Sequence, residues 1–383
     1  MVQQRSGAVL PVVVVLLGLL GCTPAATPAA SATPGALHTT ACTPYTAPRD
    51  AADVNAVVSG FRDQPLARGG DVGADVTLHD GRRLWVFGDT LRQIDGADTM
   101  VRNSMLLFGG GCAQVLLPAG DGAVIPDRGD GIGYWPMSIA VSRRDGVDLV
   151  GVMSQRVRAA DGTFGFENLG AALAVFRVAD GELPALVSVT DFGPDSADTA
   201  RAAWGAAAWI HSDGYVYLYG TSHPDRPLVF GWALSAARVR VEDVLDQAAW
   251  RYWDGGQWQQ DPARAVELVP AEGGVSQTLS VLERDGTWYA VSKRDDFLGK
   301  DLVVWSAPGP TGPFTPHATG VSLPSDPDSR TYRYMPLAHP DLPAPAGHVV
   351  VSYSRGSDDL ARLARDPALY RPRFLTVRLP TAS

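Results

Sequence analysis

Five stretches of the chain, spaced roughly 60 to 70 residues apart, repeat one pattern: a segment of small or polar residues, a turn, and a run rich in apolar residues. The segments are 70–75, 134–138, 204–206, 274–277 and 334–337, and the runs are 84–87, 149–152, 215–218, 288–291 and 348–351. Long-period repetition of short strands is typical of a β-propeller, in which each repeat forms one blade. We therefore expect an all-β fold: a five-bladed β-propeller of four-stranded antiparallel blades.

The turns between segment and run support this interpretation. The first four repeats use Asp80-Gly81, Asp145-Gly146, Asp213-Gly214 and Asp285-Gly286, and the fifth uses Pro-Ala-Gly at 345–347. Tight hairpins favour Asp-Gly because their backbone φ angles must be positive. In a propeller the innermost strands face one axis, so we expect the five segments to line a shared cavity. Short helices are expected at 241–250 and 358–365.

The N-terminus indicates export. Arg5 and an apolar run lead to Leu19-Leu20-Gly21-Cys22, which resembles the lipobox of bacterial lipoproteins. This resemblance implies a signal peptide over 1–21 and a lipid on Cys22, which would anchor the exported protein to the outer surface of a membrane. A secretory peptide cut elsewhere and an uncleaved membrane helix are the alternatives.

The rest of the chain divides simply. Residues 22–42 are rich in Ala, Thr and Pro and are expected to form a flexible tether, followed by one folded domain over 43–383. Cys42 and Cys112 are expected to form a disulfide that joins the start of the domain to the first blade, and a catalytic cysteine is the alternative. The net charge of −9 argues against a nucleic-acid partner. We expect a monomer.

The first repeat carries a more specific motif. It reads Gly-Gly-Asp at 69–71, Asp-Gly-Arg-Arg-Leu-Trp-Val-Phe-Gly-Asp-Thr at 80–90 and Arg-Asn-Ser at 102–104. The motif resembles the opening blade of bacterial five-bladed propeller glycoside hydrolases, closest to the endo-D-arabinanase family formerly catalogued as a domain of unknown function. The resemblance implies cleavage of an extracellular or envelope polysaccharide such as arabinan. Over the later repeats it is mainly architectural.

Glycoside cleavage needs two carboxyl groups, one that protonates the leaving oxygen and one that acts as base or nucleophile. The resemblance implies that Asp71 is the base or nucleophile. Asp75 lies on the same face if the strand is extended, and Asp89 closes the apolar run, so both are expected to hold charge and geometry in the catalytic site. The alternatives are turn capping by Asp71 or Asp75 and backbone bonding by Asp89.

The general acid is missing from its usual place. In arabinanase-type propellers it comes from the inner strand of the third blade, but residues 203–207 here are Ala-Trp-Gly-Ala-Ala. Glu167, which follows Phe164 and Phe166 in the segment 164–170, is the expected acid, because aromatic neighbours would desolvate it and raise its pKa. A solvated loop position is the alternative. Asp295 is the second choice, and otherwise a substrate-binding group.

Other groups suit sugar recognition. Trp135 and Trp204 open inner segments and could offer flat platforms to a sugar ring, or pack in the core. Asn103, Gln277 and Arg333 are expected to bond with sugar hydroxyls.

His339 lies where some related propellers bring a histidine toward a calcium ion in the central channel, and a buried, hydrogen-bonded imidazole is the alternative. We expect that no cofactor is required, and a calcium ion in the central channel is the alternative. The competing function is a non-catalytic propeller that binds carbohydrate or serves in envelope assembly. A protein-binding scaffold is a third interpretation and would expose a large apolar patch.

Overall fold

The computed structural model describes residues 36–161, 165–326 and 328–381. The chain divides into two units, Met1–Ala32 and Thr33–Ser383, and all that follows concerns the second. The predicted signal peptide and Cys22 lie outside the described residues. Within those residues, no helix is long and apolar enough to cross a membrane.

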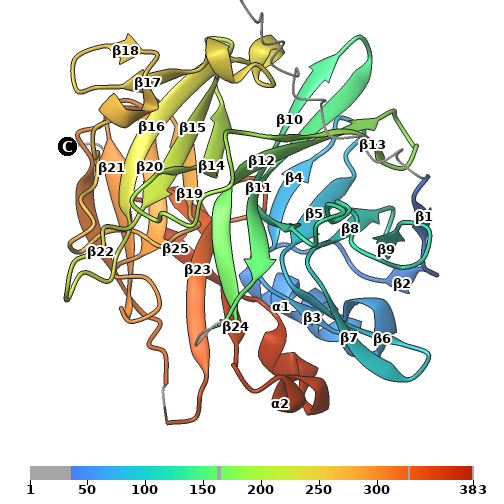
Figure 1. Ribbon diagram of the computed structural model, residues 1–383. Helices are drawn as coiled ribbons and strands as arrows, with labels where there is room; N and C mark the ends of the chain where they lie inside the picture. Colours follow the sequence, from blue (N-terminus) through green and yellow to red (C-terminus); the bar gives the residue numbers. More distant parts are fainter. Residues whose placement is uncertain (1–35, 162–164, 327, 382–383) are drawn as a thin grey trace, which may run out of the picture. The chain divides into compact units, whose positions relative to one another are not determined.

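The described strands form six antiparallel sheets, whose order along the chain can be followed in Figure 1. The first sheet contains β1 (His38–Thr39), β2 (Thr43–Pro44), β4 (Ala74–Thr77), β5 (Arg83–Phe87), β8 (Ser104–Gly109) and β9 (Cys112–Leu117). A small hairpin sheet contains β3 (Gly69–Gly70), β6 (Thr90–Ile94) and β7 (Ala97–Val101). The second sheet contains β10 (Gly133–Arg144), β11 (Val147–Ala159), β12 (Phe166–Val178) and β13 (Ala185–Asp191).

Three further sheets follow. The third contains β14 (Ala203–Ile210), β15 (Tyr215–Ser222), β16 (Ala233–Arg240), β17 (Arg251–Trp253) and β18 (Trp258–Gln259). The fourth contains β19 (Ser280–Arg284), β20 (Thr287–Lys293), β21 (Asp301–Ala307) and β22 (Thr315–Ser322). The fifth contains β23 (Tyr332–His339), β24 (His348–Gly356) and β25 (Arg373–Arg378). The predicted all-β class is confirmed, and strand number varies among the sheets.

The apolar runs of the sequence are strands buried on both faces. In β5, Leu84 and Val86 enter a core cluster shared with the second sheet, whereas Trp85 enters one shared with the fifth. Side chains alternate between the faces of a strand, so a strand covered on both sides needs apolar residues at every position. This explains why the repeats read as continuous apolar runs.

Five core clusters connect the five main sheets in cyclic order. They lie between the first and second sheets, the second and third, the third and fourth, the fourth and fifth, and the fifth and first. The inner strands β4, β10, β14, β19 and β23 also contact one another in this order, and β23 contacts β4. Burying one Val or Leu contributes about 1.5–3 kcal/mol, so these clusters hold neighbouring sheets together. The arrangement is propeller-like.

The Asp-Gly turns differ in detail. Asp145-Gly146 and Asp285-Gly286 have positive φ at both residues, as a two-residue hairpin of this type requires. They join β10 to β11 and β19 to β20. In the turns Asp80-Gly81 and Asp213-Gly214, only the glycine has a positive φ angle.

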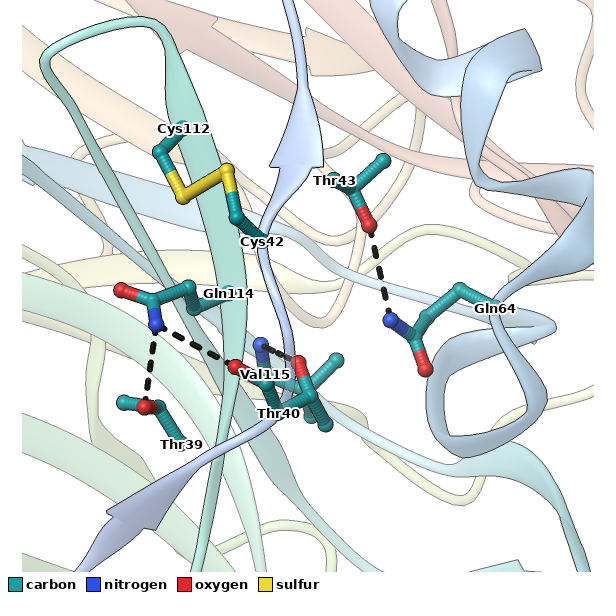
Figure 2. The surroundings of a disulfide bond; sticks show 8 residues. All are labelled: Thr39, Thr40, Cys42, Thr43, Gln64, Cys112, Gln114 and Val115. Carbon is teal, nitrogen blue, oxygen red and sulfur yellow. Dashed lines mark hydrogen bonds between the residues drawn. A yellow bond between two sulfur atoms is a disulfide. The ribbon is translucent and has the colours of Figure 1, made fainter.

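The N-terminal segment is tied to the first sheet. β1 and β2 both pair with β9, and Cys42 forms the predicted disulfide with Cys112 (Figure 2). Figure 2 also shows Gln114 donating to Thr39 and the backbone of Val115 donating to Thr40. Pairing therefore begins at His38, inside the stretch expected to be tether.

Two α-helices occur in the described residues, α1 (Ala51–Gly60) and α2 (Leu360–Arg365). Helix α2 was predicted from the sequence but α1 was not, although Asp50 caps α1 by accepting a hydrogen bond from the backbone of Asp53. The helix expected at 241–250 is replaced by two 3₁₀ turns, Val241–Asp243 and Gln247–Ala249. The remaining 3₁₀ turns are Phe61–Asp63, Pro65–Ala67, Pro262–Arg264 and Pro367–Tyr370.

Candidate functional site

A cavity of about 310 Å³ lies where the first, second, fourth and fifth repeats meet; we call it the inner cavity. Its polar lining includes Asp71, Asp89, Gln155 and Gln277. Further along the same inner strands lies a second space of about 240 Å³, lined mainly by small and apolar residues. Asp71 and Asp89 therefore meet in the inner cavity, whereas Asp75 and Asp341 line the second space.

Asp71 is aimed by an unusual backbone. Val72 and Gly73, which follow it, have φ angles of 64° and 74°. A left-handed conformation is costly for a β-branched residue, and such strain is concentrated at functional sites. The turn separates Asp71 from β4, which begins at Ala74. The expectation that Asp71 and Asp75 share one strand face is therefore wrong, because the segment between them is not extended.

The Phe-Gly-Asp-Thr motif places a second carboxylate beside the first. The backbone of Asp71 pairs with Gly88 and Asp89 at 2.9 and 3.3 Å. A Cβ atom on Gly88 would lie 2.5 Å from Oδ1 of Asp71, so any other residue there would displace the Asp71 carboxylate. The Asp89 carboxylate accepts a hydrogen bond of 2.7 Å from the indole of Trp135.

The pKa values of both carboxyl groups are raised. Burial raises the pKa of Asp71 to about 6, although hydrogen bonding from Tyr334 and Tyr370 favours its ionised form. Burial and the negative charge of Asp71 raise the pKa of Asp89 to about 7. Two close carboxyl groups in a water-poor site tend to share one proton at neutral pH. The pair can therefore supply a base and an acid together.

Aromatic rings form much of the remaining lining. Phe297 stacks on Tyr334 with ring centroids 4.8 Å apart, and the Tyr334 hydroxyl donates to Asp71 at 2.9 Å. Trp135 and Phe166 meet edge to face at 4.4 Å. Such faces and edges suit the apolar side of a sugar ring.

Gln155 adds a polar group without a protein partner. It is 3% exposed, lines the inner cavity, and its side-chain oxygen accepts no hydrogen bond within the described part of the chain. A buried acceptor of this kind is normally paired, and a ligand hydroxyl would pair it.

Asp75 belongs to a separate network. Its carboxylate bonds to Arg83 and to Nδ1 of His339, whose Nε2 lies 2.8 Å from the hydroxyl of Ser352. The Asp75 side chain is 3% exposed and Ser352 is fully buried. Burial raises the pKa of Asp75, but His339 and Arg83 outweigh burial and lower it. The order Ser–His–Asp is that of a hydrolase triad, yet no substrate can reach the serine, so the network is structural.

Glu167 is solvated and paired. It lies in β12 opposite Arg158, and the two side chains form an ion pair at 2.7 Å with exposed fractions of 39% and 52%. Phe166 lines the inner cavity, whereas Glu167, the next residue, does not. Alternation along the strand explains the difference. The expected desolvation of Glu167 is therefore corrected, since its side chain faces water and a cation.

Some of the other predicted site residues line the inner cavity, and the rest lie outside it. Trp135 and Gln277 line the inner cavity. Trp204 is buried against Tyr252, and Asn103 is buried and bonds to the backbone of Ile125 and Tyr134.

Asp295, Arg333 and His339 also lie outside the cavity lining. The Asp295 carboxylate accepts a hydrogen bond from the backbone of Gly273, and Arg333 donates to the carbonyl of Pro324. His339 is the buried, hydrogen-bonded imidazole that was the alternative interpretation. Among the described residues, no group of three or more His, Cys, Asp and Glu side chains is arranged to hold a metal ion.

Several residues that line the inner cavity were not predicted as site residues from the sequence. They are Gln155, Phe166, Phe297, Tyr332, Tyr334 and Tyr370. Tyr334 could have been found, because it stands in the fifth inner segment at the place where Asp71 stands in the first. Phe297 and Tyr370 lie outside the repeats and carried no local signal.

Comparisons with known proteins agree with the fold. The family model described as "Domain of unknown function (DUF5005)" matches residues 61–379. No curated protein matches the chain. The chain is similar to the solved structure of a candidate hydrolase from Bacteroides ovatus, with a TM-score of 0.62 and 19% identity over 81% of this chain and 85% of that one.

Two GH43 structures are less similar. A GH43_1 enzyme from Xanthomonas citri has a TM-score of 0.44 and 15% identity over 83% of this chain and 91% of that one. A β-xylosidase/α-arabinofuranosidase from a compost metagenome has a TM-score of 0.44 and 13% identity over 83% and 94%. Of these three structures, the one from Bacteroides ovatus has a score that supports a shared fold, and at 19% identity it supports the fold alone.

Proposed function

Because the chain belongs to the DUF5005 family, which has no assigned function, we propose a function from the inner cavity itself: the protein is a glycoside hydrolase that uses Asp71 and Asp89. The observation that carries the proposal is the placement of two buried carboxyl groups, each with a raised pKa, in one cavity lined by aromatic rings. Proton donation to a leaving oxygen and base or nucleophilic attack by a second carboxylate are the two demands of glycoside cleavage.

The surroundings assign the two roles. Tyr334 and Tyr370 stabilise negative charge on Asp71, which makes it the base or nucleophile. Within the described part of the chain, the Asp89 carboxylate accepts a side-chain hydrogen bond from Trp135, and it experiences the charge of Asp71, so it holds the shared proton. Asp89 therefore replaces Glu167 as our candidate acid.

The test uses Asp71→Asn and Asp89→Asn on two kinds of substrate. With arabinan and xylan, each variant should lose about 10²–10⁴-fold in kcat. With an aryl glycoside whose leaving group needs no proton, Asp89→Asn should keep most of its kcat while Asp71→Asn stays inactive. Asp95→Asn, in the exposed turn between β6 and β7, is the matched control. Equal loss by Asp89→Asn on both substrates would exclude it as the acid.

A carbohydrate-binding protein without catalysis is the second candidate. It is favoured by the position of Glu167 outside the cavity and by the lack of a carboxylate from the third sheet in the described lining. Sugar binding without new reducing ends from the wild type would support it.

We also propose the finer architecture. The cyclic contacts of the inner strands and the cyclic core clusters support a closed propeller of five blades, with the hairpin sheet as an insertion in the first. We further propose arabinan or a related envelope polysaccharide as substrate, an acylated Cys22 on an exported, membrane-anchored protein, and a monomer. Mass spectrometry of the mature N-terminus would test the acylation.

A further inference from the structure

A second, larger space adjoins the inner cavity. It has a volume of about 720 Å³, against about 310 Å³ for the inner cavity, and we call it the outer chamber. Four residues, Asp89, Met100, Trp135 and Phe166, line both spaces. Ligand pockets for small molecules are about 300–1,000 Å³, so the outer chamber is large enough for a ligand of its own.

The wall between the two spaces separates the two candidate catalytic carboxyl groups by the space that each one lines. Asp89 faces both spaces, whereas Asp71 lines only the inner cavity. In glycoside cleavage the acid contacts the leaving-group oxygen, and the base or nucleophile acts at the sugar that keeps the anomeric carbon. A substrate bound across this wall would place that sugar beside Asp71 and its leaving group on the outer side of Asp89.

The outer chamber is built to bind an uncharged glycan. In its lining, Arg102 is balanced by Asp127, Arg158 is balanced by its partner Glu167, and Asp89 carries the shared proton. Arg102 pairs with Asp127. Because a guanidinium and a carboxylate each have several hydrogen-bonding positions, both groups can also bond to sugar hydroxyls. Phe166 is 36% exposed at the boundary and offers ring surface to a sugar.

We propose that the outer chamber binds the leaving-group side of a neutral oligosaccharide, over more than one sugar unit, so that the protein acts on chains. This inference rests on the proposed function, because Asp89 defines which side the leaving group takes. The substrate class is therefore a neutral polysaccharide rather than a disaccharide or a uronic-acid polymer.

Gly122 gives a sharp test. It lines the outer chamber but not the inner cavity, its φ is not left-handed, and a Cβ there meets no atom within 4 Å. Gly122→Trp should therefore fold and narrow the chamber. Gly129→Trp is the matched control, since Gly129 is exposed, equally unobstructed and outside both spaces. Thermal unfolding of both variants would verify folding.

The probes are arabino- and xylo-oligosaccharides from disaccharide to hexasaccharide. In the wild type and Gly129→Trp, kcat/KM should rise at least tenfold with length, and in Gly122→Trp this rise should disappear. Calorimetric binding of the same series to Asp71→Asn, with and without Gly122→Trp, separates binding from catalysis.

Each outcome is decisive. If Gly122→Trp hydrolyses the oligosaccharides with an unchanged length dependence, the outer chamber does not bind substrate, and the proposed hydrolase activity still stands. Length-dependent binding that Gly122→Trp abolishes, without hydrolysis by the wild type, would overturn the hydrolase and support the chamber as a binding groove. If no oligosaccharide binds to Asp71→Asn, with or without Gly122→Trp, both the proposed function and the proposed role of the outer chamber are wrong.

Discussion

Asp71 and Asp75 stand four residues apart and have opposite electrostatic environments. Asp71 lines the inner cavity beside Asp89 and its pKa is raised, whereas Asp75 lies between Arg83 and His339 and its pKa is lowered. The left-handed backbone at Val72 produces the difference, because it turns the chain between them. At this scale a single backbone irregularity determines which carboxylate is available for chemistry.

This contrast predicts opposite effects on stability. Between the ordinary Asp pKa, near 4, and about 6, the folded protein holds more protons at Asp71 than the unfolded chain, so stability falls as pH rises through this window. Asp71→Asn cannot ionise and should therefore be more stable than the wild type at about pH 8, by about 1–3 kcal/mol, with the gain fading below about pH 4. Urea denaturation at several pH values measures this.

Asp75→Asn is the matched comparison. The lowered pKa of Asp75 contributes stability that is present above its unfolded pKa and lost as pH falls, so removing its charge should destabilise the protein at neutral pH. A gain for Asp71→Asn that does not change with pH would contradict the role of ionisation.

Among the elements, α1 protects the edge of the fifth sheet. The last strand, β25, pairs only with β24 among the described strands, and its other edge faces α1. The Asn55 side chain donates to the carbonyl of Phe374 at 2.8 Å and accepts from its backbone N–H at 3.0 Å. The helix thus supplies the hydrogen bonds that another strand would make, which limits edge-to-edge association.

Asn55→Ala should therefore lower the free energy of unfolding by about 1–3 kcal/mol, because it leaves a donor and an acceptor of Phe374 unpaired. Ser59→Ala is the control: its hydroxyl bonds to the carbonyl of Asn55 on the exposed side of the same helix, and a change within about 0.5 kcal/mol is expected. Chemical denaturation compares the two. Equal stabilities would show that water replaces the Asn55 bonds.

Across the whole folded unit, the two ends of the domain meet. The cluster between the fifth and first sheets includes Val54 of α1, Val115 of β9 and Phe374 of β25. The segment that carries Cys42 pairs with β9 in the same region. The disulfide therefore stabilises the contact between the beginning and the end of the domain.

Removing the disulfide should weaken the whole unit. Cys42 and Cys112 are 70 residues apart in sequence, and closing such a loop stabilises a protein by about 4 kcal/mol on the chain-entropy model. A Cys42→Ala/Cys112→Ala variant should lose about 2–4 kcal/mol of unfolding free energy yet keep its sugar binding, since neither residue lines the inner cavity. Unchanged stability would mean that strand pairing alone holds the segment.

The sequence by itself determined the all-β class, the five repeats and the disulfide, because these follow from local signals: apolar runs, Asp-Gly turns and cysteine count. It also pointed to Asp71 and Asp89 through the motif of the first repeat. Only the tertiary structure decided which residues join them. Tyr334, Tyr370 and Phe297 reach the cavity from distant segments, and Glu167 is turned away by strand alternation. Local patterns encode secondary structure, whereas a site between sheets depends on which side chains converge when the chain closes.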